Sequence, residues 1–312
     1  MAGTLKDRIL NSEKPAIARG ISLVENETKS AVVLLKSLYT NTGNAYVIGI
    51  TGPPGAGKST LTNCLAKLLR TKGFKLGIIA VDPTSPFTGG ALLGDRIRMQ
   101  DLQGDNDVFI RSMATRGSLG GLSKKAKETC EILDASGKDF ILIETVGVGQ
   151  SELDIAQTSD TTIVVLVPES GDAVQTMKAG LMEIGDIFVI NKSDRDGSDA
   201  LGTALRTMLH LKMTKDSDRE TPVVKTVATQ NKGIDELAEF IFLHKVYLEK
   251  KGRLAEKRKE NLIKQINELV NNRLEHRFWS GQRKDMLDKM IDKIAGREVN
   301  PYDFVDELFG AG

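Results

Sequence analysis

Cysteine and histidine are scarce in this 312-residue sequence, its charge is nearly balanced, and long apolar runs are missing. The two cysteines, Cys64 and Cys130, lie far apart and outside any CxxC pair, which excludes a disulfide framework and a cysteine-based zinc site. No apolar run approaches the roughly 18–20 residues that a membrane span needs. Lys and Arg total 43 and Asp and Glu 42, so the net charge of +1 argues against a broad basic surface for nucleic acid.

The first 15 residues also lack targeting features. They contain no apolar core of a secretion signal, and they are not the Arg- and Ser-rich, acid-poor stretch of a mitochondrial transit peptide. Hydrophobic residues make up 40% and charged residues 27%, which is typical of a globular protein and excludes a disordered chain. We therefore expect a cytoplasmic α/β protein whose partners include neither nucleic acid nor a membrane.

Apolar runs alternate with helical patterns through the middle of the sequence. Five runs are typical of parallel strands buried on both faces, and the last of the six is more polar: 45–50, 77–81, 140–143, 161–167, 187–190 and 222–227. This alternation predicts a doubly wound, mainly parallel sheet with right-handed crossovers. We expect a helical N-terminal arm over 1–43, an α/β core over 44–247 and a helical C-terminal arm over 248–312.

The C-terminal arm is highly charged but carries one apolar stripe. Its apolar residues recur at helical spacing, which predicts an amphipathic helix: Leu262, Ile263, Ile266, Leu269, Val270 and Leu274. Acidic residues are interleaved with basic ones over 250–260, and no aromatic residues lie between them. We interpret these charges as a solvated helix face rather than a surface for nucleic acid or lipid.

A phosphate-binding loop follows the first predicted strand. Residues 52–60 match G-x-x-x-x-G-K-[ST] between a strand and a helix, which is the context that supports such a match. Glycines let backbone N–H groups surround phosphate oxygens, and the helix N-terminus adds partial positive charge. The lysine can reach the β- and γ-phosphates, and the next hydroxyl can bind Mg²⁺. We predict a nucleoside-triphosphate site, with Lys58 also catalytic, formed by Gly52, Pro53, Pro54, Gly55, Ala56, Gly57, Lys58, Ser59 and Thr60.

An N-K-x-D sequence at the end of a later strand points to guanine. The carboxylate of Asp194 can accept from guanine N1–H and the 2-amino group together, a pair of donors that adenine lacks. Asn191 can hold the neighbouring loop and the guanine N7, and Lys192 lies between these two residues. Farther on, Ala228 and Thr229 lie where GTPases place a turn whose backbone contacts guanine O6, although the usual Ser-Ala pair is absent.

Three carboxylates are candidates for a magnesium site. Glu144 ends one predicted strand, where Ras-like GTPases carry Asp, and Asp82 ends another. The doubly wound topology brings both to one edge of the sheet. Mg²⁺ prefers octahedral oxygen ligands, usually one or two carboxylates with waters and phosphate. We expect Ser59, Asp82, Asp95 and Glu144 to hold Mg²⁺ directly or through its waters, with a solvated loop acid as the alternative for Asp95.

Long segments of the sequence resemble one family. AVDPTSPFTGGALLGDRIRM, IETVGVGQSE, the phosphate loop and NKSD together resemble the MeaB/ArgK group of GTPases, and the resemblance covers nearly the whole chain. These GTPases assist adenosylcobalamin-dependent acyl-CoA mutases, chiefly methylmalonyl-CoA mutase, and the human relative is the methylmalonic aciduria type A protein. The resemblance implies a P-loop NTPase fold and a homodimer made or supported by the C-terminal arm. It also implies a chaperone that gates cofactor loading, protects the mutase and helps to expel damaged cobalamin, which the partner would bind.

The resemblance also indicates loops that respond to the nucleotide. They correspond to 85–99, to 146–153 with the switch residues Gly147 and Gln150, and to a loop with Asp172, Gln175 and Lys178. We expect Mg²⁺-dependent hydrolysis of GTP to GDP and phosphate that is slow without a partner, because no obvious water-positioning glutamine directly follows the Gly147 motif. Our hypothesis is that Gln175 or Lys178, with Asp172 beside them, completes the site when the mutase docks. The alternative is an arginine finger across the dimer from Arg96, Arg98 or Arg116.

Three other functions share features with this sequence. A nickel-inserting maturation GTPase shares the phosphate loop but needs thiolate or imidazole ligands, and the sequence has no His-rich tract and no paired cysteines. A kinase is suggested by the older ArgK label, but no second substrate pocket is indicated, and NKSD favours a GTPase switch. A nucleotide-gated scaffold with negligible hydrolysis stays open, and turnover measured with and without a mutase would distinguish it.

Overall fold

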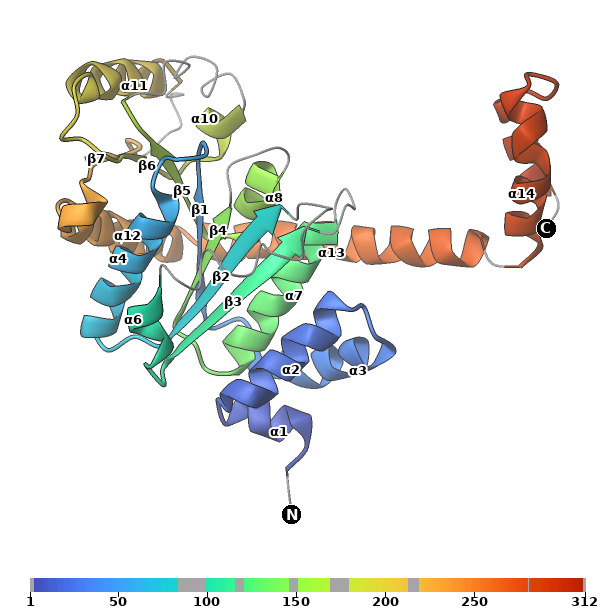
Figure 1. Ribbon diagram of the computed structural model, residues 1–312, viewed down its shortest axis with the longest axis horizontal. Coiled ribbons are helices and arrows are strands. Elements are labelled where there is room, and N and C mark those ends of the chain that lie inside the picture. The colour runs from blue at the N-terminus through green and yellow to red at the C-terminus, as the bar shows by residue number, and fades with distance from the viewer. Residues whose placement is uncertain are drawn as a thin grey trace. The chain divides into compact units, whose positions relative to one another are not determined.

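A computed structural model describes residues 3–83, 99–115, 121–145, 151–168, 180–212, 219–279 and 281–310. The contacts divide the chain into two compact units, Met1–Lys257 and Arg258–Gly312. In the first unit, helices cover both faces of a central sheet (Figure 1). None of the described helices combines the length and the apolar character that crossing a membrane requires.

The described part of the sheet has seven parallel strands in the order β3-β2-β4-β1-β5-β6-β7. They are β1 (Tyr46–Thr51), β2 (Leu76–Pro83), β3 (Val108–Thr115), β4 (Phe140–Thr145), β5 (Thr161–Leu166), β6 (Ile187–Ile190) and β7 (Val223–Lys225). The predicted doubly wound α/β fold with helical extensions is confirmed. Strand order reverses on the two sides of β1, and in such sheets ligands bind beyond the carboxyl ends of the strands at this point.

Side chains alternate between the two faces of the sheet, and each face has its own helices. Ile78 and Leu142 join a core with α4 (Lys58–Thr71), α6 (Gln100–Gln103) and α12 (Ile234–Lys250). Ile79 and Ile141, one residue away in each strand, join the core on the opposite face. The helices of that face are α7 (Gly121–Ala135), α8 (Ser151–Thr158), α10 (Met182–Ile184) and α11 (Ser198–Lys212).

The predicted N-terminal arm forms three helices and a short 3-10 turn. They are α1 (Leu5–Leu10), α2 (Lys14–Glu25), α3 (Lys29–Leu38) and η1 (Tyr39–Asn41). Ile17 and Ile21 of α2 are fully buried and belong to the same apolar cluster as Ile132 of α7 and Ile141 of β4. These helices therefore share a core with the sheet, and Figure 1 shows them beside α7.

The sequence does not predict β3. Arg111 and Ser112 interrupt its apolar run, which hides the strand pattern. The strand lies at the edge of the sheet, where a polar residue can find a partner beside the sheet. Arg111 does so, because its Nε donates to Glu25 Oε1 of α2 at 3.1 Å.

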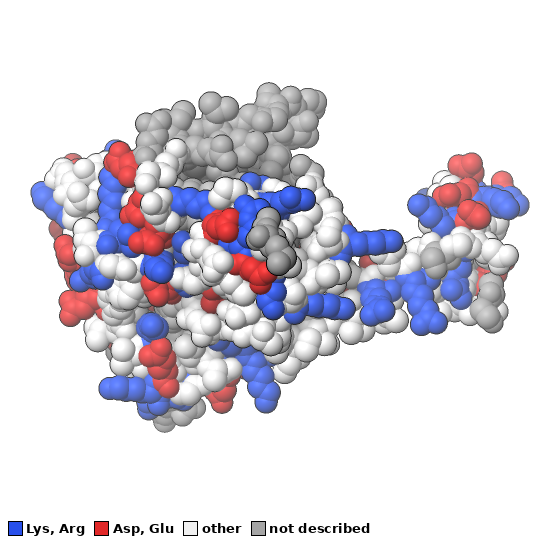
Figure 2. Space-filling view, turned by 90° about the horizontal axis from the view of Figure 1, so that it is seen from below, with Lys and Arg blue, Asp and Glu red and all other residues white. Residues whose placement is uncertain are grey.

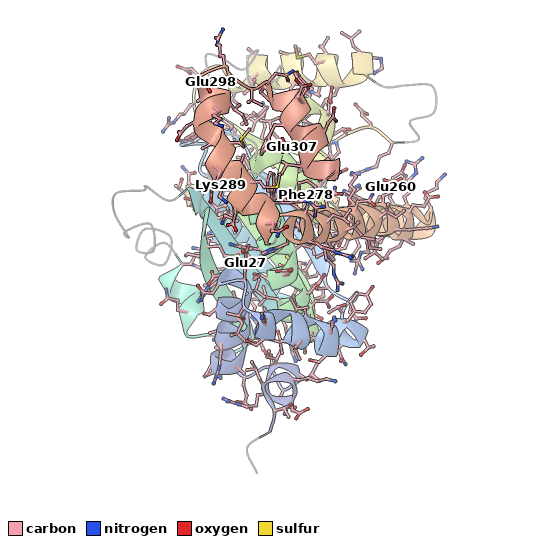
Figure 3. The ribbon with its side chains drawn as sticks, turned by 90° about the vertical axis from the view of Figure 1, so that its right-hand side faces the viewer. Glu27, Glu260, Phe278, Lys289, Glu298 and Glu307 are labelled. Atoms are coloured by element: carbon pink, nitrogen blue, oxygen red, sulfur yellow. The ribbon has the colours of Figure 1, made fainter. Side chains whose placement is uncertain are left out.

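The division between the units falls within α13 (Arg253–Phe278). The second unit contains this helix from Arg258 onward, together with α14 (Gln282–Ala295) and α15 (Pro301–Gly310). Phe278 lies at the end of α13 (Figure 3). The centres of the Phe278 and Phe309 rings lie 4.7 Å apart, and the Arg283 guanidinium lies 4.8 Å from the Phe278 ring centre. Arg283 Nε also donates to Leu308 O at 3.0 Å. The predicted amphipathic helix is present, and its six stripe residues are 37–59% exposed.

Candidate functional site

The phosphate loop joins the end of β1 to the start of α4. Gly52 and Gly57 have φ angles of 135° and 85°, which glycine adopts easily. A Cβ on Gly52 would lie 2.0 Å from Val165 O, and a Cβ on Gly57 would lie 2.4 Å from Asn191 Nδ2. The loop therefore lies against β5 and the N-K-x-D segment, and it leads into the helix N-terminus that attracts anions.

Lys58 is held over the phosphate loop. It is the first residue of α4, and its Nζ donates to Gly52 O at 2.8 Å and to Pro53 O at 2.9 Å. Only 5% of the residue is exposed. The loop carbonyls keep the ammonium where phosphate oxygens would compete for it, so the arrangement suits a lysine that neutralises phosphate charge.

Ser59 and Glu144 meet where β4 ends beside β1. Glu144 pairs in register with Ile50 of β1, and Ser59 is the second residue of α4. Ser59 Oγ donates to Glu144 Oε1, and both residues are buried. A hydroxyl and a carboxylate beside a phosphate loop are the oxygen ligands that Mg²⁺ prefers, so these residues fit such an ion.

Asp82 and Asp95 are the other residues predicted to hold Mg²⁺. β2 lies beside β4 with Ala80 in register with Glu144, so the Asp82 backbone is two residues farther along the same edge. The structure does not describe the Asp82 side chain, and Asp95 lies outside the described residues.

The predicted switch and partner-dependent residues also lie outside the described ranges. They are Gly147 and Gln150, the three residues Asp172, Gln175 and Lys178, and the alternative arginines Arg96, Arg98 and Arg116.

Asn191 connects the phosphate loop to the predicted base-recognition turn. Its Nδ2 donates to Ala56 O at 2.8 Å, and its Oδ1 accepts from Ala228 N at 3.2 Å. Only 3% of the residue is exposed, so little water competes for these hydrogen bonds. The structure therefore brings three sequence-distant segments together through one side-chain amide.

The rest of the N-K-x-D segment lies at the surface beside this amide. Lys192 adopts a left-handed φ of 55°, and Ser193 N donates to Thr226 O at 3.0 Å. Asp194 is exposed, as is Thr229 in η3 (Ala228–Gln230). An exposed carboxylate next to a fixed turn can accept from a nucleobase that arrives from solvent.

Two residues that the sequence does not single out support the same turn. Thr226 Oγ1 donates to Asn191 Oδ1 at 3.1 Å, and Cys64 Sγ donates to Ala228 O at 3.2 Å. Burial raises the pKa of the Cys64 thiol. Neither residue belongs to a motif, because each contributes through a contact between separate elements that spacing in the sequence does not show.

This chain is similar in sequence and in fold to known proteins. The family profile described as "Methylmalonyl Co-A mutase-associated GTPase MeaB" matches residues 17–283. A Pyrococcus abyssi protein provisionally named as a GTPase is 49% identical over an alignment that covers 100% of this chain and 98% of that protein. The mouse protein named methylmalonic aciduria type A homolog, mitochondrial, is 32% identical, over 97% of this chain and 77% of the mouse protein. The crystal structure of a LAO/AO transport system kinase is similar with a TM-score of 0.74 and 26% identity, over 98% of this chain and 95% of that one.

Proposed function

This chain belongs to the MeaB family of GTPases, and from that membership we propose that it is the chaperone of an adenosylcobalamin-dependent acyl-CoA mutase, in the first instance methylmalonyl-CoA mutase. The family predicted from the sequence is confirmed, and the chain is a GTPase. One observation supports the nucleotide site in this proposal: the Asn191 side chain donates to Ala56 O of the phosphate loop and accepts from Ala228 N of the turn that we assign to the base. The mutase association in the family description supports the choice of partner.

In this proposal the phosphate end of the site works by positioning and charge. Lys58 exchanges the carbonyls of Gly52 and Pro53 for oxygens of the β- and γ-phosphates. Glu144 accepts the Ser59 proton, which leaves the lone pairs of the Ser59 oxygen for a cation, and with Asp82 and Asp95 these residues would hold Mg²⁺. A bound Mg²⁺ would offset negative charge on the phosphate oxygens.

The base end of the site selects guanine in the same proposal. Asp194 accepts from the guanine N1–H and 2-amino groups, and the turn at Ala228 and Thr229 donates to O6, with the Ala228 N–H shared between O6 and Asn191 Oδ1. Asn191 keeps the two ends in register. The chain then cycles between GTP and GDP, and the mutase rather than this chain binds cobalamin.

We further propose that the chain acts as a cytoplasmic homodimer. The stripe residues of α13 give the second unit an apolar surface, and pairing with a second copy would cover it.

Asp172, Gln175 and Lys178 would complete the hydrolytic site when the mutase docks. On the face of the first unit drawn in Figure 2, Lys and Arg are mixed with Asp and Glu, which fits a protein partner better than nucleic acid.

The test is GTP hydrolysis at fixed Mg²⁺, alone and with purified methylmalonyl-CoA mutase. We expect the mutase to raise turnover by about tenfold or more, which corresponds to about 1.4 kcal/mol of barrier. Gln175→Ala and Lys178→Ala should keep the basal rate and lose the stimulation, and Lys58→Ala should lose both. With γ-labelled GTP the label should appear as free phosphate, whereas transfer of the label to protein would favour a kinase.

Two outcomes would contradict the proposal in different ways. Turnover without stimulation, together with no complex on gel filtration, would keep the GTPase and remove the proposed partner. Stimulation that survives both single substitutions would keep the partner and remove the roles of Gln175 and Lys178.

A further inference from the structure

We propose that Cys64 is a positioning residue that determines base specificity, because from the phosphate-loop helix it holds the backbone turn that recognises guanine. This inference rests on the proposed assignment of Ala228 to the base. It adds a residue that no nucleotide-binding motif in the sequence contains.

The Ala228 peptide groups are anchored from two sides. Its N–H lies 3.2 Å from Asn191 Oδ1, and its carbonyl accepts from Cys64 Sγ at 3.2 Å. Asn191 in turn donates to Ala56 O of the phosphate loop at 2.8 Å. One anchor therefore reaches the loop itself, and the other reaches the helix that begins at the loop.

Thr226, just before the turn, is linked to Asn191 and Ile190, whereas other hydrogen bonds over 227–232 are internal to the turn. Val227 N donates to Lys232 O at 3.1 Å, and Lys232 N donates to Val227 O at 3.3 Å. Asn231 N donates to Ala228 O at 3.1 Å. These bonds set the shape of the turn but not its place relative to the phosphate loop, since both partners of each bond move together. Placement depends on links to other elements, such as those from Asn191 and Cys64.

Cys64 is suited to this task by its element and its surroundings. It lies six residues after Lys58 on α4, which is fixed in the core by the fully buried Leu61 and Leu65. Burial raises the pKa of the Cys64 thiol, so the sulfur stays protonated at neutral pH and can donate. Partial burial also limits competition from water for a weak S–H donor. Losing the donor would therefore loosen the base end of the site and leave the phosphate end intact.

The experiment compares Cys64→Ala, which removes the donor, with Cys64→Ser, which keeps one. Cys130→Ala is the matched control, because Cys130 lies in the core on the opposite face of the sheet. Dissociation constants for GDP and ADP are measured by calorimetry on the full chain, together with kcat at saturating GTP. Urea unfolding shows that each variant is folded.

We expect Cys64→Ala to weaken GDP binding by about three- to tenfold, the size of one modest hydrogen bond. ADP binding and kcat should not change, because the phosphate loop and its lysine are untouched. Cys64→Ser should recover most of the GDP affinity, and Cys130→Ala should match the wild type.

Three results would overturn the role of Cys64: an unchanged GDP affinity in Cys64→Ala, an equal loss for GDP and ADP, or a serine variant as weak as the alanine variant. A wild-type protein that does not prefer GDP to ADP would instead overturn the base assignment on which the inference rests. The two failures are therefore distinguishable in one data set.

Discussion

Glu144 is the residue on which the proposed metal side of the site depends most. Its carboxylate accepts from Ser59 in surroundings that are nearly closed to solvent, so its charge acts through a low effective dielectric. The Asp101 side chain, by contrast, is 72% exposed in its ion pair with Lys67. A surface pair of this kind contributes little, because water and salt screen it.

Glu144→Gln keeps the shape of the side chain and removes its charge. We expect Mg²⁺-dependent GTP hydrolysis to fall by about 100-fold or more, because charge stabilisation at the phosphates is lost. GDP binding without Mg²⁺ should change little, since the phosphate loop remains intact. Asp101→Asn is the control and should retain full activity. Wild-type turnover in Glu144→Gln would show that this carboxylate does not serve the metal.

His244 is a buried base outside the nucleotide site. Only 3% of it is exposed, and its Nδ1 lies 2.8 Å from Thr161 Oγ1, which in turn lies 2.6 Å from the Tyr46 hydroxyl. Burial lowers the pKa of His244 from 6.5 to about 4, although nearby Asp186 opposes the shift. The imidazole is therefore neutral in the folded protein at physiological pH.

This shift makes stability depend on pH in a defined window. Above pH 6.5 His244 is neutral in both the folded and the unfolded state, so it does not affect stability. Between pH 6.5 and about 4 only the unfolded chain takes up the proton, so the free energy of unfolding falls as the pH is lowered. His244→Gln removes the titration and keeps a polar group for Thr161. From pH 7 to 4.5 we expect the wild type to lose about 2–3 kcal/mol more than the variant in urea unfolding. Equal losses would contradict the shifted pKa.

Among the elements, the phosphate loop offers a direct test of why its glycines are needed. In Gly52→Ala the new Cβ would meet the Val165 carbonyl, and backbone rather than a flexible side chain would have to move. We expect a loss of about 3 kcal/mol or more in the free energy of unfolding without nucleotide. Gly55→Ala is the matched control, because Gly55 also has a positive φ, of 77°, but has no atom within 4 Å of the added Cβ. Gly55→Ala should lower the free energy of unfolding by about 1 kcal/mol. Equal losses in the two variants would show that the positive φ angle alone, and not the contact with Val165, determines the loss of stability.

Strands and loops with strong local patterns could be predicted from the sequence. The apolar runs predict β1, β2, β4, β5 and β6, a more polar run predicts β7, and the glycine-rich loop predicts the junction of β1 with α4. The sequence could not show β3, because the partner of Arg111 lies on α2. It could not show the contact of Cys64 with Ala228 either, since these residues are 164 positions apart. Contacts between elements, rather than local patterns, therefore carry the information that was missing.

For the whole molecule, the stripe on α13 leads to a prediction about assembly. Ile266 lies in the middle of the stripe and is 50% exposed in the single chain. If two copies bury the stripe, Ile266→Asp should weaken the dimer by about 100-fold or more, since each copy loses the burial of one large apolar side chain. Sedimentation equilibrium measures this. Lys264→Ala, at an exposed position of the same helix, is the control and should leave the mass of the assembly unchanged. The GDP affinity should not change in either variant. A wild-type chain that is already monomeric would contradict the proposed homodimer.

The position of Lys58 has a consequence for how the protein responds to salt. An exposed lysine in an empty site attracts anions from solution, and an arriving phosphate must release them. Here the ammonium is buried and donates to two carbonyl oxygens of its own loop. When a nucleotide binds, phosphate oxygens replace these carbonyl oxygens as the partners of Lys58. Fewer counterions are then released on binding than the number of charges in contact suggests. The affinity for GDP should accordingly fall only gently as ionic strength rises, which lets the site keep its nucleotide across a wide range of salt concentrations.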